Sequence, residues 1–413
     1  MDSPGATKPK ILIIGAGFGS MAVAVRLKNV GAEVTLVSHR NFNLFTALLY
    51  QTSTGVVDMD HLAQVVRPQA RKHGFRFVEG DVTSVDLDAR KIQTSFGELT
   101  YDYLVIAVGS ENNDFGIKGV AQNTLPLKTI NDGELMHNKI VGSWEKAAVE
   151  EDEAKRRALL SFVVIGAGAT GVELAGSIRD LVRVMAKDYP EVKERASVTL
   201  IEALPTVLPG LSDYMVRKTG EALLKRGVKV RTSSKVVEVS ERGVLLQGGE
   251  LVESANVFWT AGVKPAKLVE SLKVDKERGR VKVDGMLRVN GHPEVFALGD
   301  MAYCMDAKTG KRLLETAAVA VQQGKWLAAA LPELIAGREV APFAFNDRGF
   351  MLSLGRNCGV ADLGWLKVSG FLGWVFWRTV HISLISANRN RFGVIFDWTF
   401  AYLNKRNIAH TEV

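Results

Sequence analysis

Two stretches decide the fold of this chain: ILIIGAGFGS at residues 11–20 and FVVIGAGATG at residues 162–171. In each, a short apolar run predicts a buried strand that leads into a glycine-rich turn, and a helix is expected to follow. This is the context in which G-x-G-x-x-G binds a dinucleotide, because glycine permits the tight turn and the next backbone N–H groups face the pyrophosphate. Two such units predict two dinucleotides and electron transfer between them. The alternative is two unrelated tight turns before helices.

The two turns differ in one motif position. Ser20 takes the place of the third glycine in the first turn, although Gly19 lies beside it. This change weakens nucleotide recognition there without removing the phosphate-binding turn. The turn residues expected to bind cofactor are Gly15, Gly17, Phe18 and Gly19 in the first copy, and Gly166, Gly168 and Gly171 in the second.

The residue after the second strand of each unit indicates which nucleotide is bound. An acid about 20 residues beyond the turn accepts hydrogen bonds from the ribose hydroxyls. The run at 197–201 reads as that strand in the second unit, and Glu202 follows it. A carboxylate there repels a 2′-phosphate, which predicts NADH over NADPH; the alternative is a solvated glutamate at a strand end. In the first unit Ser38 stands where the acid belongs, and Arg40 comes two residues later.

Composition places the chain among globular proteins. It has 413 residues, 47% hydrophobic and 23% charged, enough for two or three domains. No run approaches 18 apolar residues, so no spanning helix is expected. The only cysteines, Cys304 and Cys358, fit a reducing compartment. Neither zinc-type cysteine and histidine spacing nor G-x-S-x-G occurs, and no metal or nucleic-acid partner is expected.

Later turns indicate how the chain is organised. Buried strands are expected to end near Gly109 and Gly262, and another short strand ends in Gly299-Asp300. The simplest architecture is an α/β fold in which the second nucleotide domain is inserted into the first. The chain then returns to the first domain near residue 280, and a separate C-terminal element follows.

The C-terminal residues read as an anchor that lies in the plane of a membrane surface. The stretch 365–406 holds six basic residues, one acid and four of the seven tryptophans. A mostly apolar row recurs at helical spacing: Phe392, Ile395, Phe396, Thr399, Tyr402 and Leu403. Arg389 and Arg391 flank one end of this row, Lys405 and Arg406 the other, and 371–377 adds an aromatic patch. Such a pattern suits an anionic bilayer surface; the alternatives are a buried helix or a dimer interface, and a homodimer is left open.

The sequence resembles the flavoproteins with two dinucleotide-binding domains, and within them the type II NADH:quinone oxidoreductases. The stretches that carry the closer resemblance are 41–51, 317–324 and 390–403, in addition to the two glycine turns. The resemblance implies FAD in the first domain (1–127 and 280–344), NADH in the second (128–279) and membrane anchoring by 345–413. It further implies a peripheral protein on the cytoplasmic face of the cell membrane, passing electrons from NADH through FAD to a membrane quinone.

The resemblance also implies roles for single residues. Asp300 corresponds to an acid that bonds the FAD ribitol, and Glu173 to a residue near the nicotinamide. Gln322 matches one of two glutamines of the quinone-site helix, whereas Ala318 replaces the other and indicates a pocket of different shape or preference. From the residues alone, Glu173 is equally a helix N-terminal carboxylate, Asp300 a helix N-cap and Gln322 a surface side chain.

Two other functions compete with this one. A sulfide:quinone oxidoreductase uses cysteines at its flavin, and two are present, but the intact second nucleotide motif with Glu202 argues against it. A non-enzymatic NADH-sensing flavoprotein resembling apoptosis-inducing factor is disfavoured by the aromatic, basic C-terminus.

Overall fold

The computed structural model describes residues 8–403 and 406–410, which form two compact units. One comprises the residues up to Asn43, together with Val65–Glu111 and Val263–Asp347. The other comprises Leu44–Gln64, Asn112–Gly262 and the residues from Arg348 onward. Each unit is described by itself below.

The first unit is built on a six-stranded sheet in the order β22-β23-β9-β1-β2-β5. Its strands are β1 (Lys10–Ile14), β2 (Glu33–Ser38), β5 (Arg76–Glu79), β9 (Tyr103–Ile106), β22 (Arg288–Val289) and β23 (His292–Ala297). All neighbours run parallel except β22 and β23. The central strand β1 is apolar on both faces because layers cover both sides of a parallel sheet.

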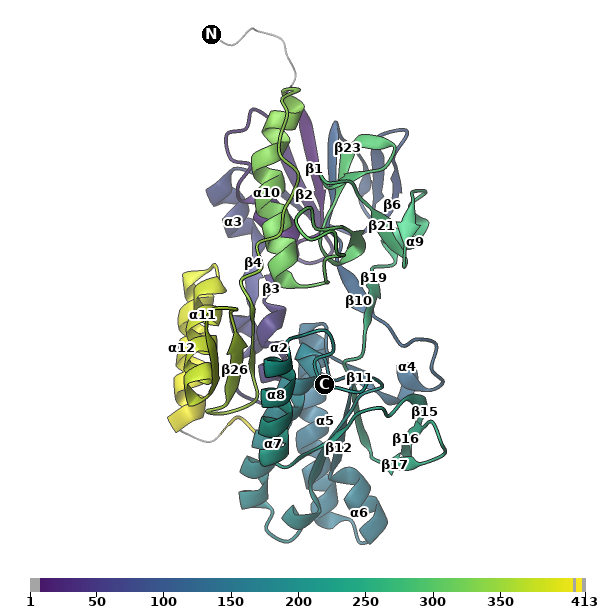
Figure 1. Ribbon diagram of the computed structural model, residues 1–413, viewed down its shortest axis with the longest axis vertical. Helices are drawn as coiled ribbons and strands as arrows, with labels where there is room; N and C mark the ends of the chain where they lie inside the picture. The colour runs from purple at the N-terminus through teal and green to yellow at the C-terminus, as the bar shows by residue number, and fades with distance from the viewer. Residues whose placement is uncertain (1–7, 404–405, 411–413) are drawn as a thin grey trace. The chain divides into compact units, whose positions relative to one another are not determined.

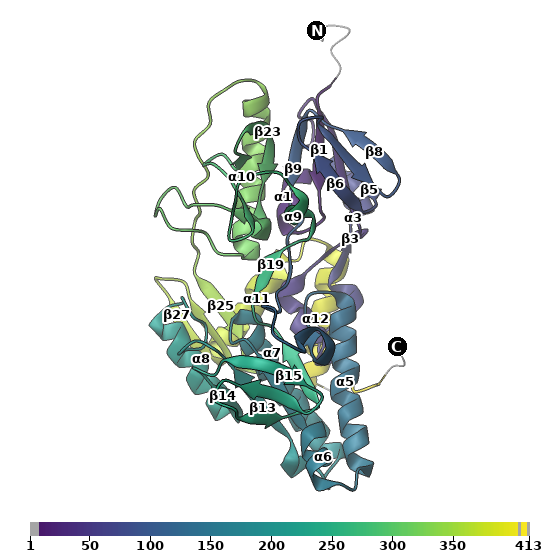
Figure 2. The same ribbon diagram turned by 90° about the vertical axis from the view of Figure 1, so that its right-hand side faces the viewer.

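Helices and smaller sheets cover this sheet. Helix α1 (Phe18–Ala24) follows the first glycine turn and packs along α10 (Ala317–Ile335); Figure 1 labels α10, and Figure 2 labels both helices. Their backbones meet closely: a Cβ on Gly324 would collide with the carbonyl oxygen of Gly19. The unit also contains α3 (Val66–His73) and an antiparallel sheet of β6 (Val82–Asp86), β7 (Lys91–Thr94) and β8 (Gly97–Thr100).

The second unit repeats the strand arrangement around its own glycine turn. Its five-stranded sheet has the order β11-β18-β12-β13-β14 and is parallel throughout. The strands are β11 (Leu125–Pro126), β12 (Ser161–Ile165), β13 (Ser197–Ile201), β14 (Val228–Arg231) and β18 (Asn256–Trp259). In both sheets the strand before the glycine turn lies between the next strand on one side and a later strand on the other, which is the switch point of a dinucleotide-binding fold.

Helices pack on this sheet, and the C-terminal residues add a further layer. The helices include α5 (Ile130–Val149), α7 (Ala169–Asp188) and α8 (Asp213–Lys225). The C-terminal layer contains β25 (Phe350–Ser353), β26 (Gly359–Asp362) and β27 (Lys367–Gly370), followed by α11 (Phe371–Leu384) and α12 (Asn388–Leu403). Strand β25 contacts α7, and β26 contacts both α8 and α11 (Figure 1).

The predicted α/β fold with two Rossmann-like units and C-terminal helices is confirmed. Among the described residues, no helix combines the length and the apolar character needed to cross a bilayer. The limits of the two cofactor domains, 1–127 with 280–344 and 128–279, stay a prediction.

Candidate functional site

The two glycine turns have the same backbone geometry. Gly15 and Gly166 have φ of 104° and 99°, values that side-chain-bearing residues rarely adopt. The N–H of Gly15 donates to Val37 O at 2.8 Å, and the N–H of Gly166 donates to Ile201 O at 2.8 Å. Each turn is thereby tied to the end of the second strand of its own unit, as the sequence predicts.

Both turns leave room on the outer side for a ligand. Gly17 and Gly168 are exposed, and a Cβ on either would meet no atom within 4 Å. A Cβ on Gly15 would instead collide with Ala107 O, and one on Gly171 with Gly166 O. The inner glycines therefore serve backbone packing, and the outer ones leave an open surface beside the start of α1 and α7, where a pyrophosphate fits.

Ser38 is the last residue of β2, and Glu202 directly follows the equivalent strand β13. Their side chains make different hydrogen bonds. Ser38 is buried, and its Oγ accepts from the N–H of Arg40 at 3.3 Å. The carboxylate of Glu202 accepts from Ala167 N–H at 2.7 Å and from Leu204 N–H at 2.9 Å. Glu202 is thus not merely a solvated side chain, because it fixes the glycine turn; each oxygen keeps a lone pair for a ribose hydroxyl.

The segments that follow β9 and β18 lie beside the glycine turns of their own units, since a Cβ on Gly15 would meet Ala107 and one on Gly166 would meet Ala261. Gly109 and Gly262 have φ of 72° and 70°. Asp300 Oδ2 accepts from Ser110 Oγ at 2.6 Å, which brings together two segments of the first unit. Asp300 lies inside a single 3-10 turn (Gly299–Met301), so its alternative reading as a helix N-cap is wrong; Thr316 caps α10 instead.

Glu173 is a buried carboxyl group in α7. Its Oε1 accepts from the backbone N–H of Ser353 at 3.0 Å, and the residue is 8% exposed. Burial raises the pKa of Glu173 to about 8, although the Ser353 N–H acts in the opposite direction. Burial therefore favours the protonated, neutral form of this group. Helix α7 has no acid in its first turn, so the alternative reading of Glu173 as a helix N-terminal carboxylate is wrong.

A chain of buried hydrogen bonds lies beside Glu173. Burial, and next the charge of Glu173, raises the pKa of Tyr50 well above its usual range. The Tyr50 hydroxyl accepts from Gln51 Nε2 at 3.0 Å, and Gln51 Oε1 accepts from Trp398 Nε1 at 2.6 Å. Sequence reasoning gave these residues no role; the stretch 41–51 carried part of the resemblance, but nothing in it indicated this partner on α12.

The two positions of the expected quinone-site helix lie in the first half of α10. Ala318 is exposed in its first turn. The Gln322 amide bonds the backbone of Asn346 twice, donating to its carbonyl at 3.0 Å and accepting from its N–H at 2.9 Å. The neighbouring Gln323 is buried, and its Oε1 accepts from Gly299 N–H at 2.8 Å. Gln322 thus links α10 to the backbone at Asn346, whether or not it contacts a quinone.

The C-terminal helices expose part of the expected apolar row. On α12 the exposed members include Phe392 at 68%, Phe396 at 66% and Leu403 at 74%. The tryptophans behave differently from the aromatic patch that the sequence predicts, because Trp374, Trp377 and Trp398 are buried in the second unit. Only Trp365 among the four in this stretch is largely exposed.

The basic flanks of α12 also depart from expectation. The Arg406 side chain is only 9% exposed and pairs with Asp180 at 3.5 Å, so it is not the exposed basic flank that the row predicts. It became buried because α7 supplies an acid that the local sequence does not reveal. Lys405 lies outside the described residues. Arg389 is exposed, whereas Arg391 donates to Ile385 O at 2.8 Å.

Cys304 is buried, and Cys358 is partly buried. Burial raises the pKa of Cys304 to about 11, and burial also raises the pKa of Cys358. Neither is therefore primed as a thiolate near neutral pH. Within 8–403 and 406–410, no group of three acidic, histidine or cysteine residues is placed to hold a metal ion.

Comparison with known proteins identifies relatives along the whole chain. Residues 9–324 match the pyridine nucleotide-disulphide oxidoreductase family, and residues 348–407 match the NDH2 C-terminal domain. The type II NADH:quinone oxidoreductase NdhA of Mycobacterium tuberculosis is 31% identical, over 96% of this chain and 87% of its own length. Ndh of the same organism is 30% identical, over 96% and 89%.

The fold also matches solved structures. NDH2 from Plasmodium falciparum in complex with NADH aligns with a TM-score of 0.92 at 22% identity, covering 98% of this chain and 100% of that one. The curated relatives carry the NADH:quinone name, and they do not support the sulfide:quinone alternative that the two cysteines left open.

Proposed function

This chain belongs to the type II NADH:quinone oxidoreductases, and we propose from that premise that it oxidises NADH through bound FAD and reduces a membrane quinone without pumping protons. The observation that carries the proposal is the pair of geometrically equivalent glycine turns, each beside an open surface in its own parallel sheet. Such a chain is suited to hold two dinucleotides, and these cofactors supply the hydride chemistry when bound.

Each cofactor is assigned to one turn. We assign FAD to the domain of 1–127 and 280–344, with Gly15, Gly17, Phe18, Gly19, Ser38, Arg40, Gly109 and Asp300. We assign NADH to 128–279, with Gly166, Gly168, Gly171, Glu202 and Gly262. The acid at the end of β13 supports the second assignment, because a carboxylate there accepts from a 2′-hydroxyl and repels a 2′-phosphate.

Glu173 and Gln322 are assigned to the reaction itself. A carboxyl group whose pKa is about 8 can hold or release a proton near neutral pH, which suits the protonation that quinone reduction requires. Gln322 is proposed to contact the quinone. Ala318, which is smaller than the glutamine usual at that position, is proposed to make the quinone pocket wider. The Asn346 backbone holds the Gln322 amide in place for this role.

The protein is proposed to act at the cytoplasmic face of the cell membrane, attached through α11 and α12. Exposed apolar side chains on these helices, among them Phe371, Leu372, Phe392 and Phe396, support this attachment. A large exposed apolar patch is typical of a surface that contacts a membrane or another protein.

A flavin assay tests the enzymatic proposal. Purified protein is mixed anaerobically with NADH, NADPH or sulfide, and flavin absorbance is followed before and after a water-soluble quinone is added. NADH should bleach the flavin and quinone should restore it. Bleaching by sulfide but not by NADH, or bleaching that quinone does not reverse, would refute the assignment.

A flotation assay tests the membrane proposal. Truncation before α12 is unsuitable, because Val394 and Trp398 belong to the core of the second unit. Phe392→Ser with Phe396→Ser should instead reduce co-flotation with liposomes while NADH oxidation with a soluble quinone persists. The matched control is Val149→Ser with Leu224→Ser, which removes two other exposed apolar side chains. Equal flotation of all three proteins would contradict attachment through this row.

A further inference from the structure

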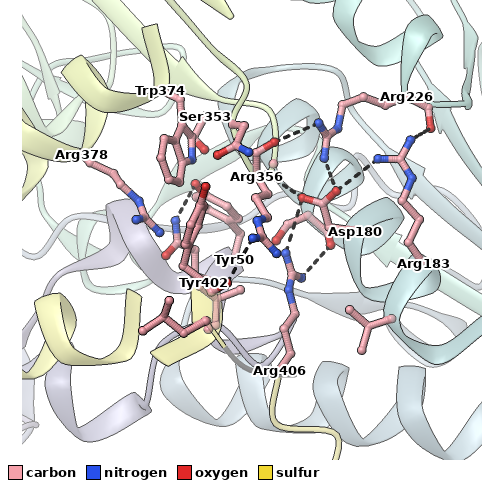
Figure 3. A pocket seen from close by; sticks show the side chains of 18 of the residues that line it. Tyr50, Asp180, Arg183, Arg226, Ser353, Arg356, Trp374, Arg378, Tyr402 and Arg406 are labelled. Carbon is pink, nitrogen blue, oxygen red and sulfur yellow. Dashed lines mark hydrogen bonds and ion pairs between the residues drawn. The ribbon is translucent and has the colours of Figure 1, made fainter. Parts of the chain in front are cut away.

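A cavity of about 830 Å³ lies wholly within the second unit, lined by residues of α7, α11, α12 and the loop after β25 (Figure 3). We call it the arginine pocket. Its lining includes six cationic side chains: Arg183, Lys187, Arg226, Arg356, Arg378 and Arg406. Asp180 is the only carboxylate among the described residues that line it. The lining thus carries a strong excess of positive charge.

Asp180 is already fully engaged by its neighbours. Its carboxylate pairs with Arg226 and, at 3.5 Å, with Arg406, and its side chain is only 8% exposed. Arg183 approaches the same carboxylate at 3.6 Å. Three guanidinium groups share one acid, so this corner of the pocket retains a net positive charge where burial limits screening by water (Figure 3).

Arg356 and Arg378 face the pocket without a carboxylate partner in the described part of the chain. The Arg378 guanidinium lies 4.0 Å from the ring centre of Trp374 and 4.5 Å from that of Trp398. The Arg356 guanidinium lies 4.2 Å from the ring centre of Tyr402 and donates to its carbonyl at 3.0 Å. Aromatic faces orient these cations but do not neutralise them, so a complementary anion is favoured.

We propose that the arginine pocket binds the phosphate group of an anionic phospholipid. Planar guanidinium groups bind phosphate oxygens in pairs, which is the recognition that several converging arginines favour. The inference rests on the proposed membrane attachment and goes beyond it, because it assigns a headgroup site to named residues.

The apolar part of the lining distinguishes a lipid from free phosphate. Ala401, Tyr402 and Leu403 line the pocket at the end of α12, and Leu403 is 74% exposed. Tyr402 and Leu403 also belong to the exposed apolar row of that helix. A ligand that joins a phosphate to acyl chains would contact both the cations and this row, whereas inorganic phosphate would use the cations alone.

Calorimetry on the FAD-loaded protein tests the proposal at constant ionic strength. The probes are short-chain phosphatidylglycerol below its micelle concentration, short-chain phosphatidylcholine and inorganic phosphate. Phosphatidylglycerol should bind at least tenfold more tightly than the other two. Arg356→Gln with Lys187→Gln should weaken that binding about tenfold or more, since two charges near the ligand are lost. The control, Lys146→Gln with Lys229→Gln, removes two exposed lysines of the same unit that lie outside the lining and should change binding less than twofold.

The outcomes separate this proposal from the one it rests on. Equal affinity for phosphate and phosphatidylglycerol would overturn the lipid assignment, as would equal losses in the pocket and control variants, or no binding of any probe. In each of these cases, wild-type flotation with vesicles containing 30% phosphatidylglycerol would leave membrane attachment standing. Failure to float with any vesicle would refute attachment itself, and calorimetry would still decide the pocket. Circular dichroism and flavin content should match among all variants.

Discussion

Glu173 and Ser353 are joined by a 3.0 Å hydrogen bond from the Ser353 N–H to the Glu173 carboxylate, across 180 positions of sequence. The bond links α7 to β25 inside the second unit and keeps a carboxyl group in a buried environment. One N–H does not offset the loss of solvation, so protonation of Glu173 is favoured in the fold.

Stability should therefore depend on pH through Glu173. The folded pKa of about 8 lies above the ordinary value of 4.5, so the unfolded chain releases this proton at lower pH. The stabilising contribution is complete below pH 4.5 and is lost as pH rises through 8, with a limiting slope of about 1.4 kcal/mol per pH unit. Thermal unfolding from pH 5 to 9 should show this loss in the wild type. Glu173→Gln keeps the shape without the titrating group, and an identical pH profile in that variant would contradict the assignment.

Replacing Glu202 should relax nucleotide choice. Its carboxylate is held by Ala167 N–H and Leu204 N–H, so the group is pre-positioned at the end of β13. Glu202→Ala should lower the NADH over NADPH ratio of kcat/KM by roughly one to two decades, the equivalent of about 1.5–3 kcal/mol for a charge-assisted hydrogen bond. Steady-state kinetics with both nucleotides measure the ratio. Glu250→Ala, an exposed acid of the same unit, is the control, and an unchanged ratio in Glu202→Ala would refute the role.

The Trp398 indole should matter for stability through its N–H. Trp398→Phe removes the donor to Gln51 Oε1 and leaves that buried oxygen without its partner, at a cost of about 1–3 kcal/mol. Urea unfolding should show this loss. Trp365→Phe makes the same chemical change at a side chain that is 83% exposed and should stay within about 0.5 kcal/mol of the wild type. Equal effects of the two substitutions would show that the buried bond contributes nothing.

Neither cysteine should be required for turnover. Burial raises the pKa of both thiols, and Cys304 lies in the core of the first unit. Cys304→Ser with Cys358→Ser should therefore retain NADH:quinone activity within about twofold, measured per bound flavin. A collapse of flavin reduction or reoxidation while FAD stays bound would instead indicate a thiol-assisted reaction.

The parts of the molecule that follow local rules could be predicted from sequence. The glycine turns at Gly15 and Gly166 require positive φ and follow apolar strands, and both conditions are visible in the residues. Helix α12 was predicted from apolar spacing, and it spans Asn388–Leu403. Such features depend on neighbours within a few positions.

The remainder depends on partners brought together by tertiary packing. Nothing near Arg406 in sequence reveals that Asp180 will pair with it, so the prediction that Arg406 is an exposed flank of the apolar row is wrong. Likewise, nothing beside Glu173 indicates that Ser353 will donate to it. A periodic pattern identifies a helix, but it does not distinguish the buried Trp398 from the exposed Phe396 without the layer that covers them.

The first unit is assembled from three separate segments of the chain, which affects how it can fold during synthesis on the ribosome. The five-stranded sheet of the second unit is completed by β18, which ends at Trp259, from one continuous stretch of chain. The six-stranded sheet begins earlier with β1 but needs β23, and α1 is covered only when α10, ending at Ile335, has emerged. Because domains fold as their residues become available, the later nucleotide sheet is expected to form first. The N-terminal strands, although made first, would wait for it with their apolar faces uncovered.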